Sequence, residues 1–461
     1  MCWSGLNRTM TVFQSLWDRI EGKTAHLVVV GLGYVGLPVS ARFAQVGFRV
    51  TGLDVDEHKV AKVTAGVCPI EGDEPGLAEL VAGVVAAGRL RATTDYAVCQ
   101  RADIVLVAVE TPIDSIHQPR YSALRAALRA LEPNLMPGTM VIIESTVAPG
   151  TMDRLVRPIL EANGSRRSGL DFFLVHCPER VMPGLLLKNL THMSRVVGGD
   201  TPEAARLAQR LYRTIVEAEL DLTDCVTAEL VKTAENAYRD VQIAFANELA
   251  LICEHVGADV WQVRELVNKS PGRSVLFPGA GVGGHCIPKD PWLLAYGASS
   301  TVAARLIPAA RELNDYMPLH MAELTVDALA EAGQEIEGAR IAVLGYAYLE
   351  NSDDTRNSPS EVLVARLQEL GAEVVIHDPW VPEYRGDLEV RVRGCDAVVV
   401  MVAHDEYRRF DWSVLKKHLR HLVLVDGRRV VVDPGRQLPG FVFRGVGRPR
   451  ACPAAASGTE A

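Results

Sequence analysis

The sequence predicts an α/β protein with two doubly wound parallel sheets, because strand-like and helix-like stretches alternate twice along the chain. The first alternation starts near residue 26 and the second near residue 340, and a helix-rich stretch separates them. At 461 residues the chain is also too long for a single hydrophobic core. We therefore expect two sheet-containing domains joined by a long central helix in a helical connector.

The first predicted strand, residues 26–30, is a continuous apolar run, which is typical of a strand buried on both faces. It runs into the glycine-rich turn Gly31–Gly36, which precedes an amphipathic stretch at residues 39–46. A second strand at residues 48–53 ends on Asp54. A strand, a glycine turn, a helix, a strand and an acid in this order predict a Rossmann-like, dinucleotide-binding domain.

The glycine turn and the acid have separable roles in such a unit. Gly31 would permit the tight turn, Gly33 would let the backbone approach the pyrophosphate, and Gly36 would allow close packing of helix on strand. Asp54 would bind the adenosine ribose hydroxyls and repel a 2′-phosphate, which favours NAD over NADP. The alternative is a glycine-rich turn that binds no ligand.

The remaining elements complete the two domains. Further strands are predicted at residues 104–109, 140–144 and 172–177, and a helix without Pro or Gly at residues 227–255. The second alternation has predicted strands at residues 340–345, 373–377, 397–402 and 422–426. The expected plan is an extension (1–24), a Rossmann domain (25–200), a helical dimerisation domain (201–331), a second Rossmann-like domain (332–446) and a disordered tail (447–461).

Composition narrows the class of protein. The net charge of −9 argues against a nucleic-acid partner. The nine cysteines are scattered singly, without the spacing of a metal site or a disulfide framework, which fits a reducing compartment. Residues 1–24 lack the apolar core of a signal peptide, and no apolar run is long enough for a membrane span. We expect a cytoplasmic protein, and Met10 is an alternative start.

Cys286 is the candidate nucleophile. Glycines precede it in Gly279-Ala-Gly-Val-Gly-Gly-His-Cys286, so its thiol would be sterically open. Lys289 would favour the thiolate, and Asp290 would orient the thiol or a water molecule. A single cysteine in a globular protein is more often an inert core residue, but glycines and charges are poor choices for a core strand.

Polar residues elsewhere could serve the same chemistry. Lys232 and Asn236 lie one helical turn apart in the predicted long helix, with Asn247 on the same side, and could stabilise an oxyanion. Glu179, Thr111 and Thr146 follow predicted strands, where α/β folds place ligand-facing residues. The alternatives are a solvated helix face and ordinary turn residues.

Six segments together resemble the UDP-glucose/GDP-mannose dehydrogenase family over residues 25–445. They are GLGYVGLP, ESTVAPGT, PERVMPG, AELVKTAENAYRD with its distal NE, GVGGHCIPKDP and LGYAYLENSDDTRNSP. The resemblance implies an NAD-binding and a UDP-sugar-binding domain joined by a long helix that forms the core of a homodimer. It also implies oxidation of the sugar C6 alcohol to a carboxylate with two NAD, through a thiohemiacetal and a thioester on Cys286.

The family's site residues transfer by motif. In catalysis, Lys232 and Asn236 would stabilise oxyanions, and Asp290, Thr146 and Glu179 would position the thiol and water or relay protons, with Glu179 as the base for hydrolysis. NAD would contact Gly31, Gly33, Tyr34, Val35, Gly36, Asp54, Lys59, Thr111 and Thr146. The UDP-sugar would contact Glu179, Arg180, Val181, Lys232, Asn236, Arg273, Phe277, Gly279, Gly281 and Arg356.

Three departures from the family pattern bear on the substrate. Pro183 stands where many UDP-glucose enzymes have a second glutamate, and Leu349 stands where a lysine is frequent. Pro271-Gly-Arg273 replaces a Pro-Arg pair, so Arg273 is the candidate for an arginine acting in trans. PERVMPG and GGHC resemble the branch that acts on UDP-N-acetylhexosamines. UDP-N-acetyl-D-mannosamine is the favoured substrate, followed by UDP-N-acetylglucosamine and UDP-glucose.

Two alternative functions from other protein classes remain compatible with the sequence. A single-step NAD dehydrogenase would use the lysine without a thiol and release one NADH per substrate rather than two. A non-catalytic NAD-binding protein would bind the cofactor without turnover, although the joint presence of Lys232, Asn236, Cys286 and Asp290 argues against it.

Overall fold

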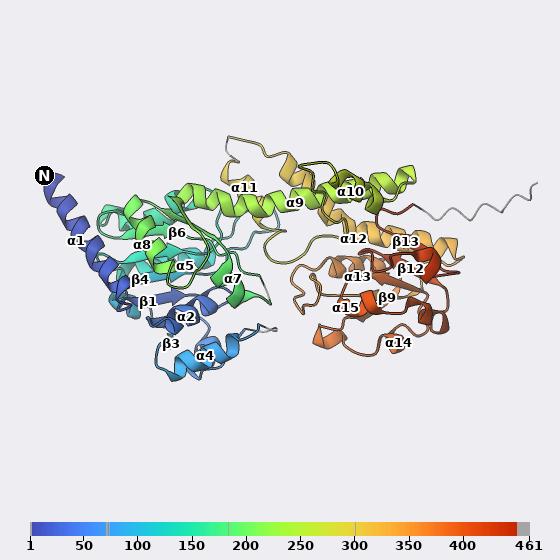
Figure 1. Cartoon of the computed structure of the whole chain (residues 1–461), viewed down its shortest axis with the longest axis horizontal. Coiled ribbons are helices and arrows are strands. Elements are labelled where there is room, and N and C mark those ends of the chain that lie inside the picture. The colour runs from blue at the N-terminus through green and yellow to red at the C-terminus, as the bar shows by residue number, and fades with distance from the viewer. Residues whose placement is uncertain (1, 71, 73, 183, 300, 450–461) are drawn as a thin grey trace, which may run out of the picture. The chain divides into compact units, whose positions relative to one another are not determined.

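The computed structural model describes residues 2–70, 72, 74–182, 184–299 and 301–449 (Figure 1). The chain divides into two compact units. Unit 1 contains the chain up to Glu235 together with Trp292–Ala303, and unit 2 contains Asn236–Pro291 and the chain from Ala304 onward. Pro183 and residues 450–461 of the predicted tail lie outside the described residues.

Unit 1 is built on an eight-stranded sheet in the order β3-β2-β1-β4-β5-β6-β7-β8. Its strands are β1 (His26–Val30), β2 (Arg49–Leu53), β3 (Leu90–Thr93), β4 (Ile104–Val107), β5 (Met140–Ile143), β6 (Phe173–His176), β7 (Arg195–Gly199) and β8 (Leu220–Asp224). Its helices and helical turns are α1 (Cys2–Glu21), α2 (Gly36–Gln45), α3 (Glu57–Thr64), α4 (Leu77–Ala86), η1 (Tyr96–Arg101), α5 (Ser122–Leu131), η2 (Glu132–Asn134), η3 (Met152–Val156), α6 (Arg157–Leu160), η4 (Ala162–Gly164), α7 (Leu186–His192) and α8 (Pro202–Tyr212).

The central strand β1 shows why the predicted apolar run forms a strand. Leu27 and Val29 point into the core formed with α2, α4, α7 and α8, whereas Val28 and Val30 point into the core formed with α5 and α6. Helices therefore cover both faces of the sheet (Figure 1). β1 pairs in parallel with both β2 and β4, so the strand order reverses its direction beside β1, and α/β folds bind ligands at such a point.

Unit 2 contains a five-stranded parallel sheet in the order β10-β9-β11-β12-β13. Its strands are β9 (Arg340–Leu344), β10 (Glu373–His377), β11 (Ala397–Val400), β12 (Val423–Asp426) and β13 (Val442–Gly445). Its helices and helical turns are α10 (Val260–Asn268), α12 (Leu306–Glu331), α13 (Pro359–Glu369), η5 (Pro382–Tyr384), α14 (Leu388–Arg391), α15 (Asp405–Arg409), η6 (Trp412–Lys417) and α16 (Pro434–Gln437).

The boundary between the two units falls within two further helices. The long helix α9 (Cys225–Val256) has 32 residues, which confirms the prediction of a long helix in this part of the chain, and the division into units falls after its residue Glu235. In the short helix α11 (Asp290–Gly297), the first two residues belong to unit 2, and the residues from Trp292 onward belong to unit 1. No helix among the described residues is both long and apolar enough to cross a membrane.

The predicted α/β class with two parallel-stranded sheets is confirmed. Four strands were not predicted, namely β3, β7, β8 and β13, and β8 lies in a stretch that we expected to be helical. These strands are short or carry charged residues, so they lack the long apolar run that marks β1. β7 also pairs antiparallel to β6, whereas we expected parallel strands.

Candidate active site

The turn after β1 has the backbone that a dinucleotide needs. Gly31 has a φ of +94°, and a Cβ on Gly36 would lie 1.8 Å from the carbonyl oxygen of Gly31. A Cβ on Gly33, in contrast, would meet no atom within 4 Å, so the space beside this glycine is open. Tyr34 and Val35 pack partly buried against the core behind the turn. A tight turn with one open glycine at the start of α2 fits a bound pyrophosphate.

Asp54 lies directly behind this turn. Its Oδ2 accepts a hydrogen bond of 2.7 Å from the backbone N–H of Leu32, and its Oδ1 accepts one of 3.0 Å from the N–H of Asp56. The carboxylate is thus fixed to the turn that would hold the phosphates. This placement fits the role in ribose binding that the sequence suggested.

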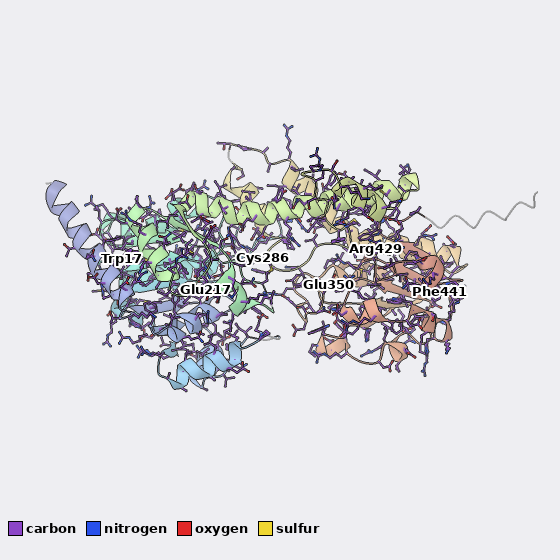
Figure 2. The ribbon with its side chains drawn as sticks, viewed as in Figure 1. Trp17, Glu217, Cys286, Glu350, Arg429 and Phe441 are labelled. Atoms are coloured by element: carbon purple, nitrogen blue, oxygen red, sulfur yellow. The ribbon has the colours of Figure 1, made fainter. Side chains whose placement is uncertain are left out.

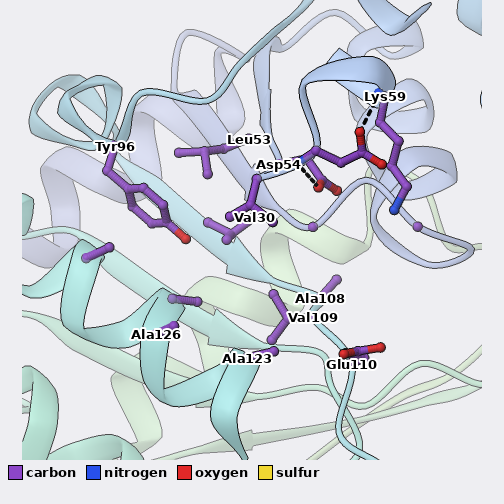
Figure 3. A pocket seen from close by; sticks show the side chains of 16 residues that line it. Val30, Leu53, Asp54, Lys59, Tyr96, Ala108, Val109, Glu110, Ala123 and Ala126 are labelled. Carbon is purple, nitrogen blue, oxygen red and sulfur yellow. Dashed lines mark hydrogen bonds between the residues drawn. The ribbon is translucent and has the colours of Figure 1, made fainter. Parts of the chain in front are cut away.

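A pocket of about 620 Å³ opens beside the turn (Figure 3). Small side chains of α5 form one wall, and the ends of β1, β2 and β4 form the other. Its lining comprises Val30, Gly31, Gly33, Leu53, Asp54, Val55, Asp56, Lys59, Tyr96, Ala108, Val109, Glu110, Ala123, Ala126, Ala127 and Ala130. An apolar slot with a carboxylate at its rim suits an adenosine, and Lys59 lies at the same rim.

The two predicted threonines meet at the ends of β4 and β5. The hydroxyl of Thr111 donates a hydrogen bond of 2.6 Å to the carbonyl oxygen of Thr146. The hydroxyl of Ser145 donates one of 2.6 Å to the carbonyl of Val109, so the two loops are tied together twice. The structure therefore brings Thr111 and Thr146 together at the carboxyl edge of the sheet.

Glu179 is buried and paired. Its Oε1 accepts a hydrogen bond of 2.8 Å from the N–H of Arg180, and its Oε2 forms an ion pair with Arg195. Arg180 in turn donates a hydrogen bond of 2.8 Å to the carbonyl of Ser194 and forms an ion pair with Glu235. Val181 packs partly buried against the same core.

In unit 2, Cys286 is exposed at the end of a glycine-rich loop whose backbone is crowded on one side (Figure 2). A Cβ on Gly283 would lie 2.6 Å from Tyr348, and one on Gly281 would lie 2.9 Å from Pro359. Gly284 donates a backbone hydrogen bond of 2.9 Å to the carbonyl of Arg356. Residues 348–359 therefore fix the course of the loop that leads to the thiol.

Asp290 connects the cysteine loop to α9. Its backbone N–H donates a hydrogen bond of 2.9 Å to the carbonyl of Cys286. Its side chain, which is fully buried, accepts a hydrogen bond of 2.6 Å from the amide of Asn236 and lies 2.7 Å from the ammonium of Lys289. The structure thus brings together three of the predicted catalytic residues, Cys286, Asp290 and Asn236. Lys232 is buried one turn before Asn236 on α9.

Two side chains fix the backbone of the predicted substrate-binding glycines Gly279 and Gly281. Arg428 was not predicted, and Asn247 was predicted for a different role. The guanidinium of Arg428 donates a hydrogen bond of 3.0 Å to the carbonyl of Gly281. Asn247, which we expected on the face of Lys232 and Asn236, is fully buried and accepts a hydrogen bond of 2.9 Å from the N–H of Gly279. Arg428 follows β12, and its place after a strand end is the signal that could have identified it.

The other predicted substrate residues of unit 2 are exposed. Phe277 is 62% exposed, and the guanidinium of Arg264 lies 3.8 Å from the centre of its ring. Arg356 forms a bidentate ion pair with Asp354. Arg273 donates a hydrogen bond of 3.1 Å to the nearby carbonyl of Pro271. Exposed aromatic and cationic groups are available to a nucleotide.

The glycine turn, the fixed carboxylate of Asp54 and the apolar pocket place the chain among the dinucleotide-binding proteins. Models of the UDP-glucose/GDP-mannose dehydrogenase family match in three parts: the NAD binding domain at residues 25–216, the central domain at 226–316 and the UDP binding domain at 342–434.

Known proteins agree with this match. The UDP-N-acetyl-D-mannosamine dehydrogenase of Pyrococcus horikoshii is 40% identical over 422 residues, which are 92% of this chain and 99% of that protein. A solved structure of the P. horikoshii UDP-D-ManNAc dehydrogenase aligns with a TM-score of 0.86, over the same shares of both chains. The NDP-N-acetyl-D-galactosaminuronic acid dehydrogenase of Methanosarcina mazei Go1 aligns with a TM-score of 0.83 at 38% identity, over 95% of this chain and 98% of that one.

The chain belongs to the UDP-glucose/GDP-mannose dehydrogenase family, as its motifs predicted. It is an NAD-dependent nucleotide-sugar dehydrogenase, and its UDP-binding domain indicates a UDP-sugar as substrate. This result disfavours the non-catalytic reading and the single-step dehydrogenase.

Proposed function

We propose that the protein oxidises the C6 alcohol of UDP-N-acetyl-D-mannosamine to the carboxylate. The observation that carries the chemistry is the exposed Cys286 on a loop of fixed backbone, followed by a buried carboxylate, Asp290, that is bonded to Asn236. The N-acetylmannosamine preference is supported by the P. horikoshii relative. The likeness to an N-acetylgalactosaminuronic acid dehydrogenase makes other N-acetylhexosamines the nearest competitors.

NAD, held by the glycine turn and Asp54, would supply the oxidising power of the proposed reaction, with two NAD taking up the four electrons as two hydrides. The alcohol first loses a hydride and a proton to give the aldehyde, and the thiol of Cys286 adds to its carbonyl to form a thiohemiacetal. Loss of a second hydride and proton gives the thioester. Water then breaks the carbon–sulfur bond, which releases the carboxylate and restores the thiol.

The chain's residues have separate roles in this scheme. Lys232 and Asn236 stabilise the negative oxygen that develops at C6, because an ammonium and an amide N–H donate to an oxyanion. Asp290 holds Asn236 in place. Thr146 positions water, and Glu179 accepts the proton of the hydrolytic water.

Separate sets of residues bind the cofactor and the substrate in this proposal. Gly31, Gly33, Tyr34, Val35, Gly36, Asp54, Lys59, Thr111 and Thr146 hold NAD. The UDP-sugar is held by Arg180, Val181, Phe277, Gly279, Gly281, Arg273 and Arg356, to which the structure adds Arg428 as a support of the Gly281 backbone.

The substrate assignment is tested by measuring NADH release with UDP-N-acetylmannosamine, UDP-N-acetylglucosamine and UDP-glucose. We expect two NADH per sugar and the highest kcat/KM with UDP-N-acetylmannosamine. Activity confined to UDP-glucose would refute the sugar assignment, and one NADH per sugar would refute the thioester route.

We also propose that the protein is a homodimer that pairs through α9. Tyr238, Phe245 and Ile252 recur every seven residues on this helix, so they share one face, and each is more than half exposed. Large apolar side chains in an exposed row usually mark a surface that a partner covers.

The Phe245→Glu variant is expected to shift the protein from dimer to monomer, because the row would then bury a charge without a partner. Sedimentation velocity or light scattering measures the change. Val390→Glu is the matched control, since Val390 is 60% exposed on α14, away from the row in sequence. An unchanged dimer in Phe245→Glu, or equal dissociation in both variants, would refute this interface.

The scattered cysteines and the required thiol of Cys286 support a reducing compartment. We therefore propose a cytoplasmic location, consistent with the use of NAD as a free cofactor.

A further inference from the structure

A buried cluster of charges surrounds Glu179 in unit 1. Arg195, the first residue of β7, is 1% exposed and forms an ion pair with Glu179. Its second Nη atom lies 3.7 Å from Glu144, which directly follows β5 and is 2% exposed. Tyr212, at the end of α8, donates a hydrogen bond of 2.5 Å to Glu144. Two buried carboxylates therefore depend on one guanidinium.

The antiparallel direction of β7 builds this cluster. Val175 and His176 of β6 pair with Gly199 and Gly198 of β7. Continuing this register by three residues places Glu179 opposite Arg195. The guanidinium also lies over the ring of Tyr212, at 4.8 Å from its centre, so its orientation is fixed on two sides.

One positive charge cannot balance two buried negative charges, so one carboxylate tends to keep its proton. Glu179 has the direct ion pair, whereas Glu144 has the longer contact and a hydroxyl donor. Burial raises the pKa of Glu144 to about 7; Glu179 adds to this rise, while Arg195 and the Tyr212 hydroxyl oppose it. The remaining titratable neighbour is Cys177, and burial raises the pKa of its thiol to about 12, so it stays neutral.

We propose that Arg195 is a positioning residue for Glu179 and that Glu144, when it ionises, competes with Glu179 for the same guanidinium. This inference rests on the proposed role of Glu179 in hydrolysing the Cys286 thioester. With Glu144 neutral, Arg195 pairs with Glu179 alone and holds its carboxylate in one place. With Glu144 ionised, the guanidinium is shared between the two carboxylates, so it holds Glu179 less firmly.

Burial places the pKa of Glu144 at about 7. As the pH rises through this region, Glu144 ionises and competes for Arg195, so the rate of thioester hydrolysis should fall. In Glu144→Gln this fall is expected to disappear, because glutamine does not ionise. In Tyr212→Phe the fall is expected to move to higher pH, because the lost hydroxyl stabilised the ionised form of Glu144.

The experiment uses the full-length enzyme with UDP-N-acetylmannosamine and NAD. Single-turnover NADH formation and mass spectrometry of acid-quenched enzyme report the acyl-Cys286 species, and both are followed from pH 5.5 to about 9, a window chosen to bracket Glu144. Arg195→Lys keeps the charge but loses the rigid fork that fixes Glu179. It should lower kcat by roughly 10- to 100-fold, change either KM little, and accumulate acyl-enzyme.

The matched control is Arg311→Lys in unit 2, because Arg311 is equally buried and is bonded to Asp240. It is expected to lower the melting temperature without accumulating acyl-enzyme. Equal acyl-enzyme levels in the two lysine variants, or a wild-type pH profile in Glu144→Gln, would overturn the inference. Glu179→Gln tests the proposed role of Glu179 separately from that of Arg195. If this variant accumulates no acyl-enzyme, the proposed role of Glu179 in hydrolysis is refuted, whatever the Arg195 variant does.

Discussion

The Cys286→Ser variant is expected to lose turnover to the carboxylate by roughly 1,000-fold or more. A thiol adds readily to an aldehyde and is a good leaving group from the resulting acyl carbon, whereas a serine hydroxyl is a poorer nucleophile and leaves an ester that water hydrolyses slowly. The fold should tolerate the change, because Cys286 is exposed and the loop backbone is fixed by its glycines and by Asp290.

NADH counting distinguishes the steps. In a single turnover, wild-type enzyme should form two NADH per sugar, and Cys286→Ser should form at most one on the same timescale. Cys68→Ser is the control, since Cys68 is a half-buried thiol in unit 1 and should leave both hydride transfers intact. Two NADH per sugar at a near-normal rate in Cys286→Ser would remove the thiol from the mechanism.

Alanine at Gly36 and alanine at Gly33 are expected to fail in different ways. A Cβ on Gly36 would lie 1.8 Å from the carbonyl oxygen of Gly31, so backbone must move and unit 1 should lose several kcal/mol of stability, roughly the 1–3 kcal/mol or more of overpacking a core. A Cβ on Gly33 meets no protein atom within 4 Å. Gly33→Ala should therefore fold normally, but its methyl group would occupy the space that the pyrophosphate needs.

Thermal unfolding and NAD titration check this pair. Gly36→Ala should melt well below wild type without ligand. Gly33→Ala should melt with wild type but bind NAD at least about 10-fold more weakly, a loss of roughly 1.4 kcal/mol. Gly83→Ala is a control on α4, where a Cβ likewise meets nothing. Normal NAD affinity in Gly33→Ala would show that the phosphates bind elsewhere.

The elements that could be predicted from the sequence are those whose signal is local. The strand β1 was marked by a continuous apolar run, and the turn behind it by glycines whose positive φ or close approach excludes other residues. The long helix α9 was marked by 32 residues without a breaker. The cysteine loop could be recognised because a run of glycines directly before a cysteine is unusual in a core strand.

What escaped prediction depends on contacts between distant segments. Arg195 reaches Glu179 only because β7 runs antiparallel, and no local pattern in Arg195–Gly199 specifies direction. Asn247 has the same helical spacing as a ligand-facing residue, but α12 covers it, and its amide donates a hydrogen bond of 2.9 Å to Asn314. Spacing gives the face of a helix, and only the fold shows what lies against that face.

The glycines before Cys286 have a consequence for how this enzyme could change its sugar preference. Gly281, Gly283 and Gly284 have no room for side chains, because Pro359, Asn357 and Tyr348 occupy the space. Substitution of these three glycines is therefore disfavoured in natural or directed evolution, and adaptation is easier through the segment 348–359 that shapes the loop. Libraries for a new UDP-sugar should randomise that segment and leave the glycines unchanged.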